Sequence, residues 1–432
     1  MLCPNGLRRR HILLAAVLLL PKQIAAAEYV LERKDVFEPY PAHVEQVYFD
    51  RLQAYRRGSS EGEIRGGLRQ YDTLERVPGA DQSELLPTTA AGDLVIPKAA
   101  LEAARRYAES MRSSAFIVWH QGKVVEESYF GGQGREQPII SRSLAKPITT
   151  LAVGTAMHAG HIESLDQPVA DFIDEWVGTE KEGILIRHLL DMRSGLLPQD
   201  FSDDPMSIYN LAYLHPYHER ILVDHYPLVQ TPGSHYEYSN AASDLVAVLI
   251  ERATGVSYHE WVSQAVLIPI GSPGGEVWVN RPGGVAHAGC CMLLPAEAWL
   301  RMGILLLQRG IWNGERLLDE AFIREISTGT GENVHAGLGV FVAGQYVERR
   351  GSFHPRLKRG QSWHSEPYLS KDLFLFDGYA SQVVYVIPDY ELVILRTGIS
   401  PPRTDPEWDN THLPNLLMRS IDMRPRPPPQ PH

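Results

Sequence analysis

The 432-residue chain is 44% hydrophobic and 22% charged, so it can bury a sizeable core as one large domain or two. Its formal net charge is −11 and it has no basic run, which argues against nucleic acid as a partner. Its three cysteines are Cys3, Cys290 and Cys291. Because neighbouring cysteines rarely bridge and this spacing fits no zinc motif, we expect two buried free thiols and no disulfide framework.

Residues 1–27 have the pattern of an export signal. Three arginines at 8–10 precede an apolar run at 12–20, and three alanines at 25–27 supply small residues for cleavage. The apolar run is too short to span a bilayer. We therefore expect a secreted or periplasmic protein with no integral membrane span after cleavage; an uncleaved anchor is the alternative.

The two ends of the remaining chain differ from its centre. Residues 28–95 mix polar stretches with glycine and proline, which predicts an N-terminal extension that wraps the main domain and carries no chemistry. The tail at 424–432 has five prolines in nine residues and is expected to be extended. The main domain is therefore placed at 96–423.

Within the main domain, the predicted elements alternate between helices and hairpins. A helix is expected at 99–111, followed by strands at 115–120 and 124–129 joined by a Gln-Gly-Lys turn. A helix that begins near Ser143 continues to about residue 160. This order predicts an antiparallel sheet with helices packed on it.

The second half of the chain contains further helices and then strands. Helices are expected at 241–254, 295–308 (amphipathic) and 319–326, the last with Asp319 as its cap. Strands are expected at 337–343, 383–387 and 392–397. Residues 201–230 are rich in His, Tyr and Asp, which suits a loop over a cleft. Tyr209, Tyr213, His215 and Tyr217 are either lining residues of that cleft or ordinary loop residues.

Ser143 and Lys146 are three positions apart where the helix is expected to start. Side chains with this spacing lie on one face, one turn apart. A serine hydroxyl is a weak nucleophile, and a lysine whose pKa is lowered can take its proton. Backbone N–H groups in a first helical turn can also hold the oxyanion that forms during attack on a carbonyl. A helix-cap serine followed by a solvated lysine fits the same pair, so the pair alone does not establish catalysis.

Further motifs follow Ser143 and Lys146 in order along the chain. They are residues 184–196, Thr231-Pro232-Gly233, Tyr238-Ser239-Asn240, residues 250–255 and Trp312-Asn313-Gly314. With these motifs, residues 96–400 resemble the serine β-lactamase and penicillin-binding-protein superfamily, and class C β-lactamases in particular. The final strands, with residues 378–388, are most similar to the 6-aminohexanoate-dimer hydrolase and esterase branch.

The resemblance implies a fold and a mechanism. The fold is α+β: an antiparallel sheet of five to six strands flanked by the terminal helices, with a mostly helical subdomain inserted at about 160–330. Ser143 would be the acylated nucleophile and Lys146 its base. Tyr238 would act as general acid and base, with its phenolate favoured by Lys146. Asn240 would orient Lys146 or the substrate amide, although a helix cap is its alternative role.

The resemblance also implies an oxyanion hole, formed by the backbone N–H groups of Ser143 and Tyr379. Gly378, Ser381 and Gln382 are placed with Tyr379 on the substrate-binding strand. No metal and no other cofactor is implied. The substrate would be a small-molecule ester, amide or peptide.

The third motif departs from the family pattern. Phe376-Asp377-Gly378 stands where β-lactamases carry Lys-Thr-Gly, so it lacks a cation, and Asp377 would repel the carboxylate of a β-lactam. This favours an esterase or amidase with a neutral or cationic acyl group. A β-lactamase or DD-peptidase is the alternative. A catalytically silent, penicillin-binding-like binding protein is the alternative from another class.

Overall fold

The computed structural model describes residues 29–60, 72–81, 85–89, 95–198, 200–351, 360–402 and 406–421. The expected export signal at 1–27 and the proline-rich tail at 424–432 lie outside the described residues. Across the described ranges, no helix is long and apolar enough to cross a membrane.

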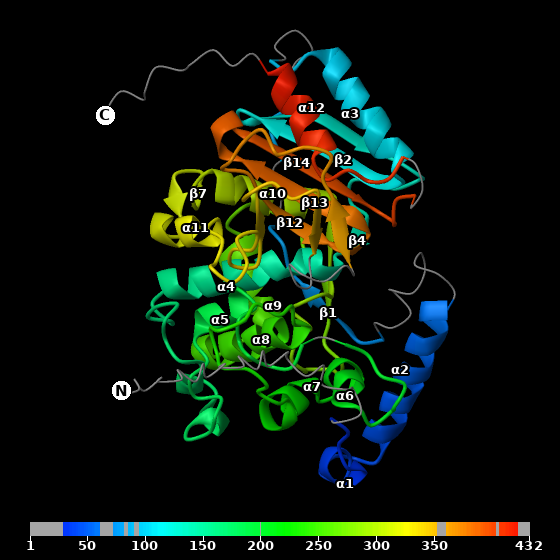
Figure 1. Cartoon of the computed structure of the whole chain (residues 1–432), viewed down its shortest axis with the longest axis vertical. Helices are drawn as coiled ribbons and strands as arrows, with labels where there is room; N and C mark the ends of the chain where they lie inside the picture. The colour runs from blue at the N-terminus through cyan, green and yellow to red at the C-terminus, as the bar shows by residue number, and fades with distance from the viewer. Residues whose placement is uncertain are drawn as a thin grey trace, which may run out of the picture.

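A six-stranded antiparallel sheet forms one half of the molecule (Figure 1). Its strands, in spatial order, are β3 (Lys123–Tyr129), β2 (Ser113–His120), β14 (Leu392–Gly398), β13 (Gln382–Ile387), β12 (Phe374–Gly378) and β9 (Phe341–Val342). The expected hairpins β2–β3 and β13–β14 are confirmed. Strand β12 was not predicted from the sequence. Of the strand expected at 337–343, only β9 forms, because Gly339 adopts a left-handed backbone with φ 68°.

The two terminal helices of the main domain cover the outer face of this sheet, as the resemblance implied (Figure 1). They are α3 (Lys98–Ser110) and α12 (His412–Ser420). Leu101 of α3 and Leu413 of α12 are buried there with Leu375 of the sheet. Burial of each such side chain contributes roughly 1.5–3 kcal/mol.

Helix α10 (Ala296–Leu307) covers the inner face. Gly303 lets it approach closely, since a Cβ there would lie 2.8 Å from Val384 of β13. The helix was predicted at 295–308, but the expected amphipathic character is wrong because residues 296–306 are all buried. Its polar residues pair with each other instead of facing water: Arg301 Nε donates to Glu297 Oε1 at 2.9 Å.

A second, four-stranded antiparallel sheet connects the N-terminal segment to the rest of the chain. Its strands, in spatial order, are β1 (Leu74–Val77), β5 (Gly275–Trp278), β6 (Met292–Pro295) and β4 (Pro138–Ile140). Strand β4 leads directly into the turn that carries Ser143. The position of that serine therefore depends on the pairing of β4 with β6.

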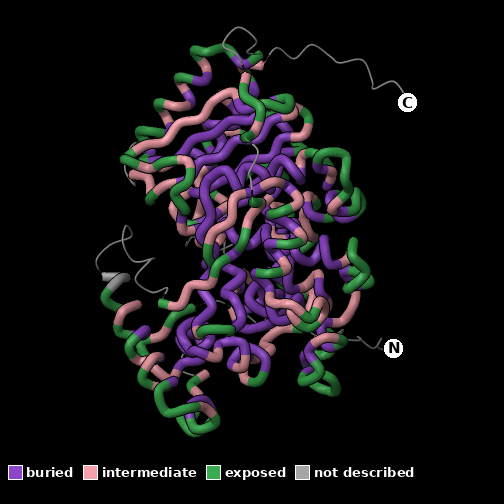
Figure 2. Tube along the Cα trace, turned by 180° about the vertical axis from the view of Figure 1, so that it is seen from behind, coloured by how far each residue is buried: buried purple, intermediate pink, exposed green. Residues whose placement is uncertain are grey.

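The other half of the molecule is mostly helical (Figure 1). Its elements are α5 (Ile186–Leu190), α6 (Ile208–Leu214), α7 (His218–Arg220), α8 (Asn240–Thr254) and α9 (Tyr258–Val262), with π-helical turns at Ile221–His225 and Ser263–Leu267. Helix α4 (Lys146–His158) lies between these helices and the sheet. Figure 2 shows a buried core that continues from the helical half to the inner face of the sheet.

The expectation that residues 201–230 form a loop over a cleft is wrong. This segment forms α6, α7 and the first π-helical turn, and most of it is buried. Its aromatic and histidine residues pack against the N-terminal segment: Tyr217 stacks on Tyr40 with ring centroids 4.4 Å apart, and His215 Nε2 lies 2.9 Å from Val36 O. His215 and Tyr217 thus hold the extension in place.

The N-terminal segment forms α1 (Arg33–Val36) and α2 (His43–Ser60). Helix α2 packs on the helical half, where the Tyr48 hydroxyl donates to Pro205 O and Arg51 Nη1 donates to Leu214 O at 3.2 Å. The remaining elements are β7 (Ile311–Trp312), β8 (Glu315–Arg316), α11 (Glu320–Ile326), β10 (Arg349–Gly351) and β11 (Gln361–Trp363).

Candidate active site

Ser143 lies in a 3₁₀ turn, Arg142–Ala145, that continues directly into α4. The helix is therefore where the sequence predicted it, with a tighter first turn. Pro147 occupies one of the first positions of α4, where its missing N–H costs little. Arg142 takes a left-handed conformation, φ 50°, at the point where β4 ends and the turn begins.

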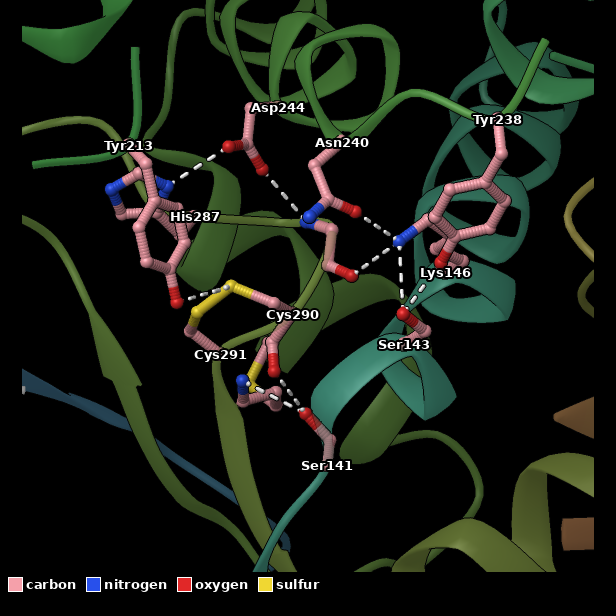
Figure 3. The surroundings of a disulfide bond; sticks show 12 residues. Ser141, Ser143, Lys146, Tyr213, Tyr238, Asn240, Asp244, His287, Cys290 and Cys291 are labelled. Atoms are coloured by element: carbon pink, nitrogen blue, oxygen red, sulfur yellow. Dashed lines mark hydrogen bonds and ion pairs between the residues drawn. A yellow bond between two sulfur atoms is a disulfide. The ribbon is translucent and has the colours of Figure 1, made fainter. Parts of the chain in front are cut away.

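Lys146 is almost fully buried, with 4% of its surface exposed. Its Nζ donates to Ser143 Oγ at 3.3 Å, to Asn240 Oδ1 at 2.6 Å and to Gly289 O at 2.9 Å (Figure 3). Burial lowers the pKa of Lys146 to about 7, and the nearby Asp244 carboxylate opposes this shift. A substantial fraction of Lys146 is therefore a free base near neutral pH and is able to accept a proton.

The Tyr238 hydroxyl donates to Ser143 Oγ at 2.5 Å, and the ring packs beneath Lys146 Nζ, 4.5 Å from its centroid. Burial raises the pKa of Tyr238 above its usual range, while the Ser143 hydrogen bond lowers it and Asp377 raises it further. The phenolate that the resemblance implied is therefore not the form favoured here. The geometry presents Tyr238 as a phenol and hence as a proton donor.

Asn240 is the first residue of α8, and two roles were open for it. The cap position belongs to Ser239, whose Oγ accepts the Ala242 N–H at 3.3 Å. The Asn240 side chain is free for Lys146, with the amide oxygen 2.6 Å from Nζ. Of the two roles, the structure favours orientation of the lysine.

The third motif lies at the end of β12, beside the turn that carries Ser143. A Cβ on Gly378 would lie 2.8 Å from Leu144 N, so this approach requires glycine. The chain then passes through Tyr379, which is 50% exposed, and two left-handed residues, Ala380 (φ 69°) and Ser381 (φ 57°). Buried Arg396 fixes this turn, with Nη1 donating to Ala380 O at 2.5 Å and to Ser381 O at 3.0 Å.

Gln382 was expected in the oxyanion or substrate-binding group, and the structure assigns it another task. Its side chain is 4% exposed, and Nε2 donates to Ile140 O at 2.9 Å and to Ser141 O at 3.2 Å. Because these carbonyls belong to the segment that leads into Ser143, Gln382 supports the turn that carries Ser143. Gly378, Tyr379 and Ser381 remain at the site's edge.

Asp377 precedes Gly378 on β12 and lies close enough to Tyr238 to influence its pKa. Burial raises the pKa of the Asp377 carboxyl group to about 7. Its charge therefore changes near neutral pH. Above that pH, this side of the site carries a negative charge.

The expectation of two free thiols is wrong, because Cys290 and Cys291 form a disulfide (Figure 3). They lie in a turn closed by the Cys291 N–H, which donates to His287 O at 3.3 Å. Ser141 Oγ donates to Cys290 O at 2.9 Å and accepts the Met292 N–H at 3.2 Å. The disulfide segment therefore contacts Ser141, at the start of the turn that carries Ser143.

A buried polar cluster lies behind Lys146. His218, Asp244 and His287 have potential ligand atoms that all lie within 4.8 Å of one another. The two imidazoles stack, however, with centroids 3.8 Å apart and planes 20° apart, so one ion cannot lie near both ring planes. Asp244 Oδ2 also lies 2.9 Å from His287 Nδ1. Asp244 and His287 thus form a hydrogen-bonded pair on which His218 stacks, with neither His218 ring nitrogen hydrogen-bonded to any described residue, and the stacked geometry does not fit a single metal ion held by all three.

Asp244 and Gly289 contact the site and were missed by sequence reasoning. The available signal was an aspartate four positions after Asn240, within the apolar stripe of a helix, where an unpaired charge is costly. Tyr209 and Tyr213, unlike His215 and Tyr217, line a small recess together with Asn240 and Asp244.

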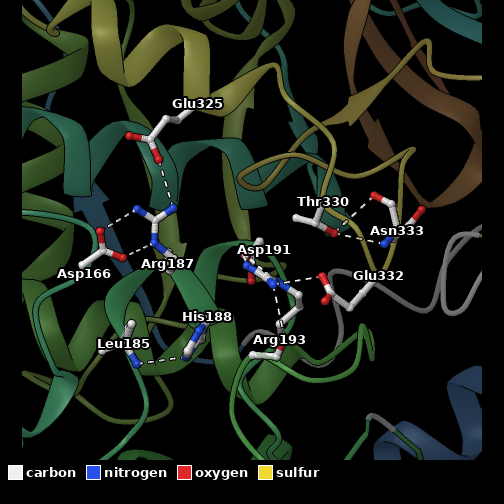
Figure 4. A network of polar contacts seen from close by, with 11 residues as sticks. Asp166, Leu185, Arg187, His188, Asp191, Arg193, Glu325, Thr330, Glu332 and Asn333 are labelled. Carbon is white, nitrogen blue, oxygen red and sulfur yellow. Dashed lines mark hydrogen bonds and ion pairs between the residues drawn. The ribbon is translucent and has the colours of Figure 1, made fainter.

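Residues 184–196, one of the segments that resemble the superfamily in sequence, have a structural role: two of their arginines form salt bridges with neighbouring segments. Arg193 bridges Asp191 and Glu332 at 2.6 and 2.9 Å, and Arg187 bridges Asp166 and Glu325 (Figure 4). The His188 side chain accepts the Leu185 N–H on Nδ1 at 3.2 Å. Figure 4 shows these residues near one another, in separate groups of polar contacts.

The beta-lactamase family model matches residues 99–397, which is more than half of the chain. The chain therefore belongs to the beta-lactamase family, a family of serine hydrolases. The resemblance read from the sequence is confirmed.

Three comparisons describe its neighbours. The 6-aminohexanoate-dimer hydrolase of Paenarthrobacter ureafaciens is 23% identical over 235 residues, which is 51% of this chain and 58% of that protein. Penicillin-binding protein 4* of Bacillus subtilis is 27% identical over 143 residues, 32% of this chain and 30% of that one. The matches thus span less than two thirds of either protein. A solved candidate 6-aminohexanoate-dimer hydrolase from Bacillus anthracis has a TM-score of 0.57 at 19% identity, covering 82% of this chain and 90% of its own, and is similar in fold.

Proposed function

We propose that the protein hydrolyses an ester or amide through an acyl-enzyme on Ser143. One observation carries the proposal: Ser143 Oγ lies between a buried lysine amine at 3.3 Å and a tyrosine hydroxyl at 2.5 Å. A base and an acid are thus both within reach of the nucleophile.

In the proposed reaction, free-base Lys146 takes the Ser143 proton as Oγ bonds to the substrate carbonyl carbon. Backbone N–H groups of Ser143 and Tyr379 hold the resulting oxyanion. The bond to the leaving oxygen or nitrogen then breaks, and Tyr238 gives its proton to that atom. The proton held by Lys146 restores the phenol. Water attacks the acyl-enzyme with the same groups and releases the acid.

The side chain next to Gly378 suggests the substrate class. Asp377 stands where family members that bind β-lactam carboxylates carry no acid, and it is ionised above about pH 7. A neutral or cationic acyl group suits this surface, whereas a carboxylate would be repelled. We therefore favour an esterase or amidase. The match to a penicillin-binding protein keeps a β-lactamase or DD-peptidase as the second candidate.

We also propose that the protein acts outside the cytoplasm after removal of residues 1–27. Two observations support this location: the signal-like pattern of those residues, and the Cys290–Cys291 disulfide, which is typical of oxidising compartments. The hydrolase domain would then span 96–423, with the helical subdomain at about 160–330.

The test is covalent labelling of residues 28–432 with a fluorophosphonate and with a labelled penicillin, read by intact mass, with Ser143→Ala as control. We expect fluorophosphonate labelling that disappears in the variant, and no penicillin adduct. A penicillin adduct on Ser143 would instead support the second candidate. A folded protein labelled by neither reagent would point to a silent binding protein.

A further inference from the structure

Lys146 is held in position by a relay, here meaning the chain of hydrogen bonds that runs from Asp244 through the Gly289 backbone to Lys146 Nζ. Asp244, one turn after Asn240 on α8, accepts the Gly289 N–H on Oδ1 at 2.8 Å. The carbonyl of the same glycine accepts from Lys146 Nζ at 2.9 Å (Figure 3). A displacement of Asp244 would therefore move the carbonyl that positions the lysine.

The relay requires a glycine at its centre. A Cβ on Gly289 would lie 3.0 Å from Ser243 Cβ and 3.3 Å from Asp244 Oδ1. Both contacts are tighter than side chains normally accept, so a larger residue would separate α8 from the turn. The close approach gives the Asp244 carboxyl group direct access to the backbone.

Asp244 is itself fixed in orientation. Its second oxygen, Oδ2, lies 2.9 Å from His287 Nδ1. The His287 ring is stacked between Trp278, at 4.2 Å, and His218, at 3.8 Å. All of these side chains are buried, and hydrogen bonds on both oxygens, to His287 and to Gly289, fix the orientation of the carboxyl group.

The cluster also determines the local charge. Burial lowers the pKa of both His218 and His287, which leaves the imidazoles neutral. The titratable groups that influence Asp244 from the neighbouring elements are Lys146, His218, His287, Tyr226 and Tyr258. Those that face Lys146 are Ser143, Tyr238 and Asp244. Burial raises the pKa of Asp244 to about 6, so above that pH Asp244 is the anionic group among them that can favour the ammonium form of the lysine.

We propose that Asp244 is a positioning residue for Lys146, which anchors the Gly289 carbonyl and whose negative charge determines when the lysine can lose its proton. The proposal rests on the proposed function, in which Lys146 is the base.

Two substitutions separate the parts of this role. Asp244→Asn keeps an oxygen that can accept the Gly289 N–H but removes the charge. Asp244→Ala removes both. A suitable control is Asp409→Asn, because Asp409 is also buried and accepts hydrogen bonds from Ser365 and Thr411, on the α3 and α12 side of the sheet.

The first measurement is the titration of Lys146 in the full chain, by trace labelling with acetic anhydride at a series of pH values and peptide mass spectrometry. This reports the lysine directly and needs no turnover. We expect the Lys146 midpoint in Asp244→Asn to move down by about one pH unit, and that in Asp409→Asn to stay at the wild-type value. An unchanged midpoint in Asp244→Asn would overturn the proposal, whatever the fluorophosphonate test shows.

The second measurement is kcat/KM against pH with a p-nitrophenyl ester. In Asp244→Asn the acid limb of this profile, over which kcat/KM rises with pH, should move to lower pH. In Asp244→Ala, kcat should be about tenfold lower than in Asp244→Asn, because a base that is out of position takes up the proton more slowly. A merely structural aspartate would lower kcat and leave the limb in place. Stoichiometric metal in the purified protein, removed by Asp244→Asn, would also overturn the proposal, since Asp244 would then be a ligand.

Discussion

The two sides of the candidate site are built in different ways. On the helical side, Lys146, Asn240 and Gly289 form a dense set of short hydrogen bonds among buried groups. On the sheet side, the chain from Gly378 to Ser381 presents mainly backbone, and Tyr379 is half exposed. Proton transfer needs fixed donors and acceptors, whereas substrate binding needs an accessible surface. Under the proposed function, proton transfer would take place on the helical side and substrate recognition on the sheet side.

The sheet side nevertheless has its own buried support. Arg396 donates to four backbone carbonyls, those of Ala380, Ser381, Met111 and Ile399. The Arg396 guanidinium thus holds the turn from Gly378 to Ser381 in place, as Asp244 and Gly289 hold Lys146 in place. Variants on the two sides should therefore change different measured quantities. Those on the helical side should change the rate and its pH dependence, and those on the sheet side should change the stability and the substrate selectivity.

The largest effect is expected at Lys146. Lys146→Met removes the base while it keeps an apolar stem, and kcat/KM for a p-nitrophenyl ester should fall about 10³-fold. Lys181→Met is a matched control, because Lys181 is also buried, donates to Val223 O at 3.1 Å and lies over an aromatic ring. Equal losses in both variants would argue against a specific role for Lys146.

The next effect is on stability. Arg396→Met leaves buried carbonyls without a donor, and the free energy of unfolding measured in urea should fall by about 3 kcal/mol. Arg349→Met is the control, since its exposed pair with Glu407 contributes little. If the two variants unfold alike, Arg396 does not support the turn as described.

The pH dependence should reflect the helical side. Because burial lowers the pKa of Lys146 to about 7, activity should rise with pH and level off above that value. Below it, kcat/KM should fall about tenfold per pH unit, as the protonated lysine cannot act as a base. A profile that is flat from about pH 5 to 9 would contradict the assignment of Lys146 as base.

Selectivity should respond to Asp377. Replacement by Asn should raise kcat/KM for an ester with a carboxylate on its acyl group, and lower it for a cationic one, each by about tenfold above pH 7. Below pH 7 the wild type and variant should converge, because the carboxyl group is then protonated. Parallel changes for both esters would show that Asp377 does not face the substrate.

The smallest effect is expected at the disulfide. Gly289 and Cys290 contact the site through backbone carbonyls, which a Cys290→Ser, Cys291→Ser variant retains. Activity should therefore change by about threefold or less. Alkylation of the unfolded wild type should add two more groups after reduction than before it; equal numbers would mean that both thiols are free.

The sequence by itself determined the parts that depend on local spacing. Ser143 and Lys146 fall on adjacent turns because they are three positions apart, and the alternation of apolar runs predicted the two main hairpins. Ordered motifs also led to the family that the comparisons confirm. Each helix, hairpin or single motif is encoded within a few consecutive residues, and the family follows from the order of the motifs along the chain.

Only the tertiary structure decided the parts that join distant segments. Beside Ser143, hydrogen bonds join residues 146, 240, 244 and 289 across up to 143 positions of the sequence, and no spacing rule encodes such contacts. The 201–230 segment was misjudged for the same reason: its polar and aromatic residues are buried by partners near the N-terminus. The chemistry of a side chain indicates what it can bind, but the fold determines which partner lies within its reach.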